Sequence, residues 1–310
     1  MIRPQLLYKT QTRWLFHSHI KLKFSVFCDD ELFSELYSVL ENVDNLYNSY
    51  SDRSFIHRIN AHSGHFVEVD DETVHILRQV KLISGFFDGE YDITVMPLVR
   101  LWGFYKEHDR TIPSQEQINK AKELVGYQSI EIDGTQVRIG KGQEIITGSF
   151  IKAYAVDKMI ERMHAMGITD AIVNAGGSTI MALADDSHPY WEIAVKHPEN
   201  NADLFTVNLA NKCFSTSTQS KTFVEINGEK YGHIISPKTG YPSANKQIGI
   251  ISDNCFIGDM VSTGLFNLSG EQFIEKMKQL SSELNVEGFM IDKHDVSYYS
   301  EKFKQYISIE

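Results

Sequence analysis

The chain has 310 residues, 42% of them hydrophobic, and a formal net charge of −11 at pH 7. This length supplies a sizeable core for one large domain or two lobes. The acidic balance excludes a typical nucleic-acid binder, which needs clustered Lys and Arg. Three widely spaced cysteines (Cys28, Cys213 and Cys255) predict neither a disulfide framework nor a zinc site. With no apolar signal segment and no run near the roughly 18 apolar residues of a membrane span, we expect a cytoplasmic chain without a span.

The N-terminal part is predicted to form a strand followed by helices. Residues 20–27 alternate apolar and polar side chains, which is the period of a half-buried strand. Residues 31–50 place six apolar side chains on one face of a helix: Leu32, Leu36, Val39, Leu40, Val43 and Leu46. A second helix is expected from about Asp71 to Phe87.

A third helix is expected to begin after Ser114, which forms a capping box with Gln117. Gly126 is the expected residue just past its C-terminus. The pair Asp133-Gly134 then predicts the turn of a hairpin.

The clearest helix covers residues 151–167. It has an apolar stripe and a glycine at its end: Ile151, Ala155, Met159, Ile160, Met163 and Gly167. The remaining pattern gives a helix over 269–284 and short strands, many in hairpins, at 171–177, 190–197, 203–210, 222–234, 248–252, 288–291 and 296–300. Because hairpins outnumber strand–helix–strand crossovers, we predict an α+β fold with mostly antiparallel sheets and packed helices.

Two stretches before and inside the clearest helix are candidates for ligand binding. Asp88 and Asp92 flank a glycine ahead of an apolar, aromatic segment, which fits a loop that holds a flat polar ligand or a plain helix end with buried aromatics. Ser149 precedes a helix, whose free N–H groups can meet an anion. Lys152 stands in the first turn, which the helix dipole disfavours for a cation, so it either meets a charged ligand or is a surface lysine.

Two further stretches have a functional and a structural interpretation. Gly176-Gly177 after a strand lets the backbone approach a phosphate, or forms an ordinary tight turn. Asp259 and Thr263 share a face if their segment is helical, and a carboxylate and a hydroxyl so placed suit Mg²⁺. The structural alternative is that Asp259 caps a helix.

His233 is a lone histidine between a strand-like stretch and a turn rich in Pro and Gly, "HIISPKTGYP". A histidine on such a corner is either a positioned general base or a side chain that packs beside Tyr231 and caps a turn.

Taken together and in order, these stretches resemble the ApbE family, the FAD:protein FMN transferases. The resemblance covers most of the chain, through "FHSHIKLKF", "SYSDRSFIHRIN", "EYDITVMPLVRLWGF", "GSFIKAYAVDK", "IVNAGGS", "STSTQS", "HIISPKTGYP" and "GDMVSTG". It implies an ApbE-like, T-fold-like domain over residues 1–310, with two lobes around the active site as a variant. It also implies Mg²⁺-dependent transfer of FMN from FAD to a Thr or Ser hydroxyl of a target redox protein, with release of AMP.

The resemblance also implies roles for individual residues. Asp259, Thr263 and Ser149 match metal ligands, the serine through its carbonyl oxygen, and His233 matches the general base. Positions that contact FAD in the family are matched by Tyr50, Glu90, Tyr91, Asp92, Lys152 and Ile234.

Several positions depart from the family pattern. Phe16-His17-Ser18 replaces Met-Gly-Thr. An Asp is usual at the positions of Ile146, Ser178 and Ser236, a Gly at Thr218, and in some members a carboxylate at Ser262. These departures keep two alternatives open. One is a divergent FAD-binding protein or FAD pyrophosphatase without transferase activity, and the other is a non-catalytic maturation partner of a redox protein.

Overall fold

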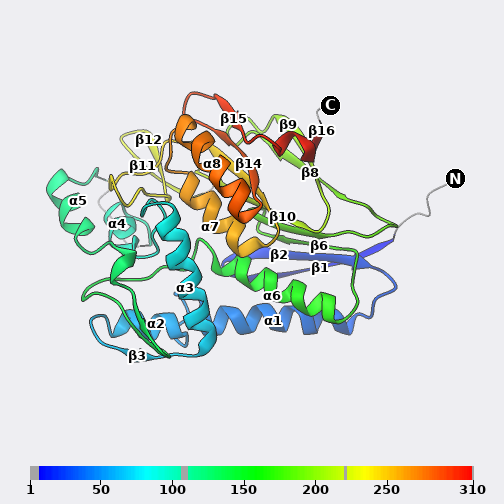
Figure 1. The fold of residues 1–310 in the computed structure, drawn as a ribbon, viewed down its shortest axis with the longest axis horizontal. Coiled ribbons are helices and arrows are strands. Elements are labelled where there is room, and N and C mark those ends of the chain that lie inside the picture. Colours follow the sequence, from blue (N-terminus) through cyan, green and yellow to red (C-terminus); the bar gives the residue numbers. More distant parts are fainter. Residues whose placement is uncertain (1–6, 106–110, 220–221, 309–310) are drawn as a thin grey trace.

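A computed structural model describes residues 7–105, 111–219 and 222–308 of the protein. Its centre is an eight-stranded antiparallel sheet with the order β1-β2-β6-β7-β10-β13-β14-β15 (Figure 1). Its strands are β1 (Tyr8–Leu15), β2 (Ser18–Ser25), β6 (Ala171–Ala175), β7 (Thr179–Leu183), β10 (Lys212–Thr218), β13 (Gln247–Ser252), β14 (Glu287–Ile291) and β15 (Ser297–Tyr299). The prediction of an α+β fold with mostly antiparallel sheets is confirmed.

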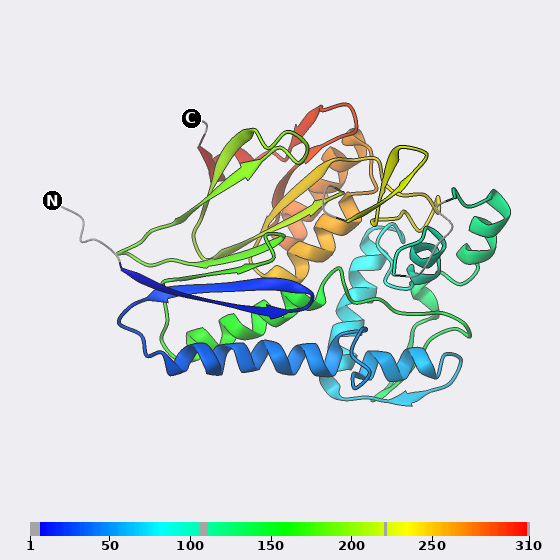
Figure 2. The same ribbon diagram turned by 180° about the vertical axis from the view of Figure 1, so that it is seen from behind.

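Helices cover one face of this sheet, and a smaller sheet covers part of the other (Figures 1 and 2). The helices are α1 (Glu31–Tyr47), α3 (Asp71–Phe86), α6 (Ile151–Ala165), α7 (Cys255–Leu265) and α8 (Gly270–Leu284). The smaller sheet contains β8 (Trp191–Lys196), β9 (Asp203–Leu209) and β16 (Ile307–Ser308). The short helix η2 (Phe303–Tyr306) directly precedes β16. Strands between the two layers, such as β13 and β14, are buried at every position, whereas β2, next to the edge strand β1, alternates.

The remaining elements gather at one end of the molecule, beside α3 (Figure 1). They are α2 (Phe55–Ala61), β3 (Val67–Glu68), α4 (Met96–Leu101), α5 (Gln115–Lys122), η1 (Tyr127–Ser129), β4 (Glu131–Asp133), β5 (Gln136–Arg138), β11 (Phe223–Ile226) and β12 (Glu229–Gly232). Trp102 is fully buried here, in a separate apolar cluster that joins α4 and α5 to the β11–β12 hairpin. In the described ranges, no helix has the length and apolar character needed to cross a bilayer.

The predictions of local structure are confirmed where they depend on the periodicity of apolar residues or on a helix-capping motif. All five apolar residues of the predicted α6 stripe are buried. Ser114 and Gln117 form the capping box of α5. The predicted hairpin forms, but its two turn residues are Gly134 and Thr135, because Asp133 pairs with Gln136. The expectation for Gly126 is wrong: α5 ends at Lys122, and Gly126 is extended, with φ 166°. The N–H of Gly126 instead donates to the Thr94 hydroxyl at 2.8 Å, so a tertiary contact determines its conformation.

The buried face of α1 is rotated relative to the prediction. Leu36, Leu40 and Val43 are buried as expected, but Leu32, Val39 and Leu46 lie at the edge of the contact. Aromatic residues fill the centre instead: Phe33, Tyr37 and Tyr47. Their burial is decided by partners on the sheet, since the Phe33 ring stacks on Phe24 and the Tyr37 hydroxyl donates to backbone carbonyls of the β1–β2 hairpin.

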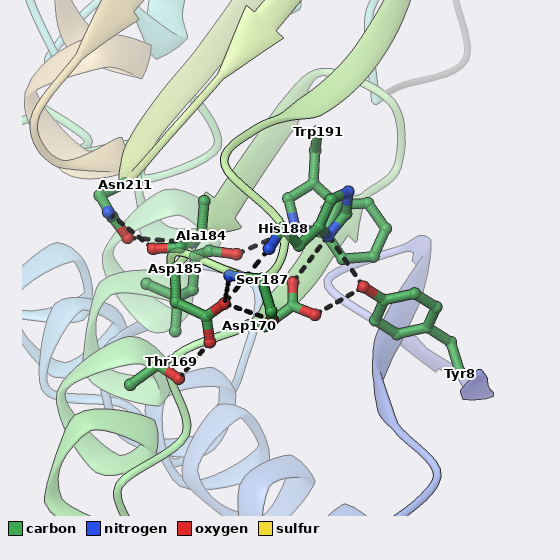
Figure 3. Close-up of polar contacts among 10 residues, drawn as sticks. Tyr8, Thr169, Asp170, Ala184, Asp185, Ser187, His188, Trp191 and Asn211 are labelled. Atoms are coloured by element: carbon green, nitrogen blue, oxygen red, sulfur yellow. Dashed lines mark hydrogen bonds and ion pairs between the residues drawn. The ribbon is translucent and has the colours of Figure 1, made fainter. Parts of the chain in front are cut away.

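A polar cluster attaches the start of β1 to the turns around β6 and β7 (Figure 3). The Tyr8 hydroxyl donates to Asp170 Oδ2 at 2.5 Å, and His188 Nδ1 lies 2.9 Å from Asp170 Oδ1. Burial and the neighbouring Asp170 carboxylate raise the pKa of Tyr8. Asp185 organises the adjacent turn by accepting hydrogen bonds from Thr169 and Ser187.

Asp170→Ala is expected to lower the free energy of unfolding by about 1–3 kcal/mol, because Tyr8 and His188 lose their shared acceptor. Urea unfolding monitored by circular dichroism measures the change. The exposed neighbour Asp186→Ala is the matched control and should leave the midpoint unchanged. Equal midpoints for both variants would contradict a structural role of the cluster.

Candidate functional site

A cavity of about 280 Å³ lies where segments from distant parts of the chain meet. The segment after α3, the start of α6, the β6–β7 turn, the end of β10, the corner after β12 and helix α7 all contribute to its wall. Nine of the ten site residues predicted from the sequence line it: Glu90, Tyr91, Asp92, Ser149, Lys152, His233, Ile234, Asp259 and Thr263. The tertiary fold therefore brings together residues that are up to 173 positions apart in the sequence.

Tyr50 is the exception among the predicted site residues. Its side chain is 40% exposed and does not line the cavity. The ring lies 5.5 Å from that of Tyr105, which does line the cavity, and 5.8 Å from that of His17 in the β1–β2 turn. Tyr50 thus stands beside the cavity behind Tyr105, and its contact with FAD stays a prediction.

Asp259 lies within α7, and two hydroxyls from neighbouring strands hold its carboxylate. Asn254 caps this helix, so the alternative that Asp259 is a capping residue is wrong. The Thr179 hydroxyl donates to Asp259 Oδ2 at 2.8 Å. Burial raises the pKa of Asp259 to about 6, while Lys152 and the hydroxyls of Ser215 and Thr179 act in the opposite direction.

Thr263 follows Asp259 by one helical turn, as its spacing predicts. Its hydroxyl donates to the carbonyl oxygen of Asp259 at 2.9 Å, so its proton is engaged and its lone pairs remain for a cation. In the ranges that the structure describes, no three His, Cys, Asp or Glu side chains form a metal-binding group. A cation here would have one carboxylate, with hydroxyl and carbonyl oxygens. This donor set fits Mg²⁺, which commonly completes its shell with water and substrate phosphate.

Lys152, in the first turn of α6, and Ser149, just before this helix, line the same cavity as Asp259. Lys152 Nζ donates to the hydroxyl of Ser178, so Lys152 is a cavity residue and not the surface lysine of the alternative interpretation. The Ser149 hydroxyl lies 3.1 Å from that of Tyr91, which is only 2% exposed. Phe150 is the residue before α6, and its side chain does not cap the helix.

Gly176 permits the close approach of backbone and side chains at the β6–β7 turn. A Cβ atom there would lie 1.9 Å from Ser18 Oγ and 3.6 Å from Lys152 Nζ, and its φ of +70° is left-handed. Only glycine fits both constraints. The turn is thus tight and also lines the cavity, so the two interpretations of the glycine pair do not exclude each other.

Asp92 has hydrogen bonds within the protein on both carboxylate oxygens. Oδ1 accepts from the N–H of Thr94 at 2.8 Å and from its hydroxyl at 2.7 Å, and Oδ2 accepts from the N–H of Tyr127 at 2.7 Å. Burial raises the pKa of Asp92, and these hydrogen bonds oppose the shift. These contacts show that Asp92 stabilises the segment that lines the cavity, and its contact with FAD stays a prediction.

His233 directly follows β12, and a backbone contact determines its tautomer. Its Nδ1 lies 3.2 Å from the carbonyl oxygen of Thr222, which accepts hydrogen bonds only. Nδ1 therefore carries the proton, and Nε2 keeps a lone pair. Burial lowers the pKa of His233, so the imidazole is neutral at pH 7, as a base must be. Its ring contact is with Phe104 at 6.3 Å, whereas Tyr231 packs against Trp102.

Hydroxyl groups replace most of the carboxylates that the family pattern led us to expect. Ser178 accepts from Lys152, Ser236 donates to Glu90 at 2.8 Å, and Ser262 lies 2.9 Å from Ser217. Ile146 instead contributes an apolar patch to the cavity wall. At the turn of the first hairpin, Phe16 and His17 both have positive φ values, 51° and 55°.

Sequence reasoning missed the residues that support Asp259. Thr179 and Ser215 are both fully buried polar residues in strands of the central sheet. The available signal was hydroxyl side chains within otherwise apolar strands, "STIMAL" and "CFSTST". Such residues are buried only when they have partners, so they mark a polar site under the sheet.

Comparison with known proteins finds relatives over most of the chain. Residues 16–287 match the ApbE family. The FAD:protein FMN transferase of Vibrio cholerae serotype O1 is 27% identical over 286 residues, 89% of this chain and 84% of the relative. That of Escherichia coli K12 is 28% identical over 294 residues, 90% and 83% of the two chains. A crystal structure of the ApbE protein from Thermotoga maritima shares the fold, with a TM-score of 0.90 at 23% identity over 98% of this chain and all of that one.

The fold, the cavity and the named relatives define a transferase-like enzyme with an α+β architecture. The chain belongs to the ApbE family.

Proposed function

We propose that the protein transfers the FMN half of FAD to a Thr or Ser hydroxyl of a target redox protein and releases AMP. The observation that carries the proposal is the composition of one cavity, whose lining includes Asp259, Thr263, Ser149, Lys152 and His233. The names of the sequence relatives, FAD:protein FMN transferase, support the same reaction. Since the cavity is built from segments between residues 90 and 267, we also propose that the chain acts as one unit.

The reaction is a phosphoryl substitution. The acceptor oxygen forms a bond to the phosphorus on the FMN side of the pyrophosphate, the bond from that phosphorus to the bridging oxygen breaks, and the bridging oxygen leaves with AMP. His233 Nε2 accepts the hydroxyl proton, for which its neutral state and its tautomer suit it. Lys152 places positive charge beside the cavity, where it would face the phosphates.

Asp259, Thr263 and Ser149 are the residues that would hold Mg²⁺. When bound, the ion neutralises charge that develops on the phosphate oxygens. Thr179 and Ser215 orient the carboxylate of Asp259 for this purpose.

The decisive experiment combines the protein with FAD, Mg²⁺ and the acceptor protein of the Vibrio cholerae transferase. In-gel flavin fluorescence after denaturation detects covalent transfer, and chromatography detects AMP. We expect both signals, and we expect excess chelator to remove both. AMP without a covalent adduct, also in the absence of acceptor, would favour the FAD pyrophosphatase. Neither signal, together with no FAD binding, would favour the maturation partner.

Lys152→Met is expected to raise the Kd for FAD roughly tenfold to a hundredfold, because a charged hydrogen-bond donor to the phosphates is lost. Isothermal titration calorimetry with FAD and with AMP measures the effect. Lys158→Met is the matched control, since Lys158 lies on the same helix but pairs with Glu72 at the surface. An unchanged Kd in the Lys152 variant would remove this residue from the nucleotide site.

A further inference from the structure

Glu90 and Tyr91 are consecutive residues that line the cavity and contact two different segments around it, the corner after β12 and the segment before α6. Glu90 Oε2 accepts a hydrogen bond of 2.8 Å from the hydroxyl of Ser236, which lies three residues after His233. The Tyr91 hydroxyl lies 3.1 Å from Ser149 Oγ. This dipeptide therefore connects the corner that carries the proposed base to a residue of the proposed metal site.

The backbone of Glu90 is held at both ends, which makes the residue a fixed attachment point. Its N–H donates to the carbonyl of Phe87 at 2.9 Å, and its own carbonyl accepts from Asn267 Nδ2 at 3.1 Å. The side chain is only 14% exposed, and Lys238 Nζ lies 3.9 Å from Oε1. The carboxylate is thus confined to the corner by contacts on both oxygens.

Ser236 is the central residue of the corner after β12, which covers residues 233–242, and it is the partner of Glu90 in this contact. Besides donating to Glu90, its hydroxyl accepts from the N–H of Thr239 at 3.2 Å. Its N–H donates to Tyr241 O at 3.0 Å, and its carbonyl accepts from Gly240 N at 2.8 Å. Since Ser236 is buried and forms four hydrogen bonds, a shift of this residue moves the whole corner.

The imidazole of His233 has its own contacts on a different part of the structure. Its hydrogen-bond partner is Thr222, next to β11, and β11 pairs with β12 in a two-stranded sheet. A two-stranded hairpin is a weakly constrained element. We call the part of the cavity lining with Asp259, Thr263 and Ser149 the metal-site wall. The distance between the imidazole and this wall therefore depends on how the corner is attached to the rest of the protein, and the hydrogen bond to Glu90 is a direct attachment.

We propose that Glu90 is a positioning residue: through Ser236 its carboxylate holds the corner so that His233 faces the metal-site wall. This inference rests on the proposed function, and it replaces the FAD contact that the family resemblance implies for Glu90. It also accounts for Ser236 at a position where the resemblance leads one to expect Asp. A carboxylate still contacts the corner, but it belongs to Glu90 in the segment after α3.

The test is a double-mutant cycle of Glu90→Ala and Ser236→Ala. Single-turnover formation of AMP from bound FAD in the presence of Mg²⁺ gives the rate, and calorimetry gives the Kd for FAD. Each single variant should slow AMP formation by about tenfold or more with a Kd within about threefold of wild type, and the double variant should be no slower than the slower single, because both changes break one link. Glu90→Gln, whose amide oxygen still accepts from Ser236, should stay within about threefold of the wild-type rate.

Glu225→Ala is the matched control, because Glu225 is an exposed carboxylate on β11 outside the cavity lining. A weakened Kd with an unchanged rate in Glu90→Ala, or rate losses that multiply in the double variant, would overturn the inference. If an alanine variant fails to fold, the swapped pair Glu90→Ala with Ser236→Asp decides. A swapped pair that folds and forms AMP at the wild-type rate supports the link. A swapped pair that is slower than the single variant Ser236→Asp refutes it. Wild-type protein that forms no AMP refutes the proposed function itself, and this inference with it.

Discussion

Asp259→Ala is expected to reduce metal-dependent FAD turnover by about a thousandfold or more, the scale on which a positioned charge-stabilising group contributes to catalysis. Asp259 supplies the carboxylate of the proposed metal site, and the other two proposed ligands, Thr263 and Ser149, are neutral. AMP formation in the presence of Mg²⁺ measures the loss. Mn²⁺ binding, followed by electron paramagnetic resonance, should weaken in parallel, which separates metal loss from other causes.

The fold should survive this change. Burial raises the pKa of Asp259, so the ionised side chain carries a desolvation cost that alanine removes. We expect an unfolding free energy within about 1 kcal/mol of wild type. The control is Asp253→Ala, which removes an exposed carboxylate that pairs with Lys212 just before the same helix. Wild-type turnover in Asp259→Ala, or in wild-type protein with excess chelator, would refute the metal site.

His233→Asn is expected to slow the chemical step by roughly a hundredfold or more, as is typical for loss of general acid–base catalysis. The Kd for FAD should stay near the wild-type value, because the role concerns the attacking hydroxyl. Single-turnover AMP formation and calorimetry measure the two quantities separately. His57→Asn, at an exposed histidine of α2, is the control.

The pH profile gives an independent check on His233. Burial lowers its pKa below the ordinary 6.5, so the base is neutral at pH 7 and loses activity only when the pH falls through this lowered value. The acid limb of kcat/KM in wild-type protein should therefore lie below pH 6.5, and it should disappear in His233→Asn. An unchanged rate in the variant would show that the corner is structural.

Local features of the sequence predicted much of the fold. The stripe of α6, the capping box at Ser114 and the hairpin that turns at Gly134 depend on residues at most a few positions apart, and all three are present. The spacing of Asp259 and Thr263 likewise predicts a shared helical face, and both residues lie on α7. Nine of the ten predicted site residues line one cavity. They were found because the motifs that contain them occur along this chain in the same order as in the ApbE family.

Contacts between distant segments decided the rest. Thr179 and Asp259 are 80 positions apart, and their hydrogen bond exists only because β7 lies under α7. Asp157 lies on α6, and its carboxylate accepts the N–H groups of Cys255 and Phe256, each at 2.8 Å, at the start of α7. Burial raises the pKa of this carboxylate to about 6 although both hydrogen bonds oppose the shift.

The amino-acid sequence by itself determined which residue types the site contains and which of them share a helix or a turn, because periodicity and capping act over one or two turns of chain. Only the tertiary structure decided their chemistry. The tautomer of His233 depends on the carbonyl of Thr222 and the orientation of Asp259 on Thr179, and Ser236 in the histidine corner donates to Glu90. The Asp259 and Glu90 contacts join segments 80 and 146 positions apart, and the His233 contact crosses the β11–β12 hairpin. The energy of each hydrogen bond exists only once the fold has brought its two groups within about 3 Å.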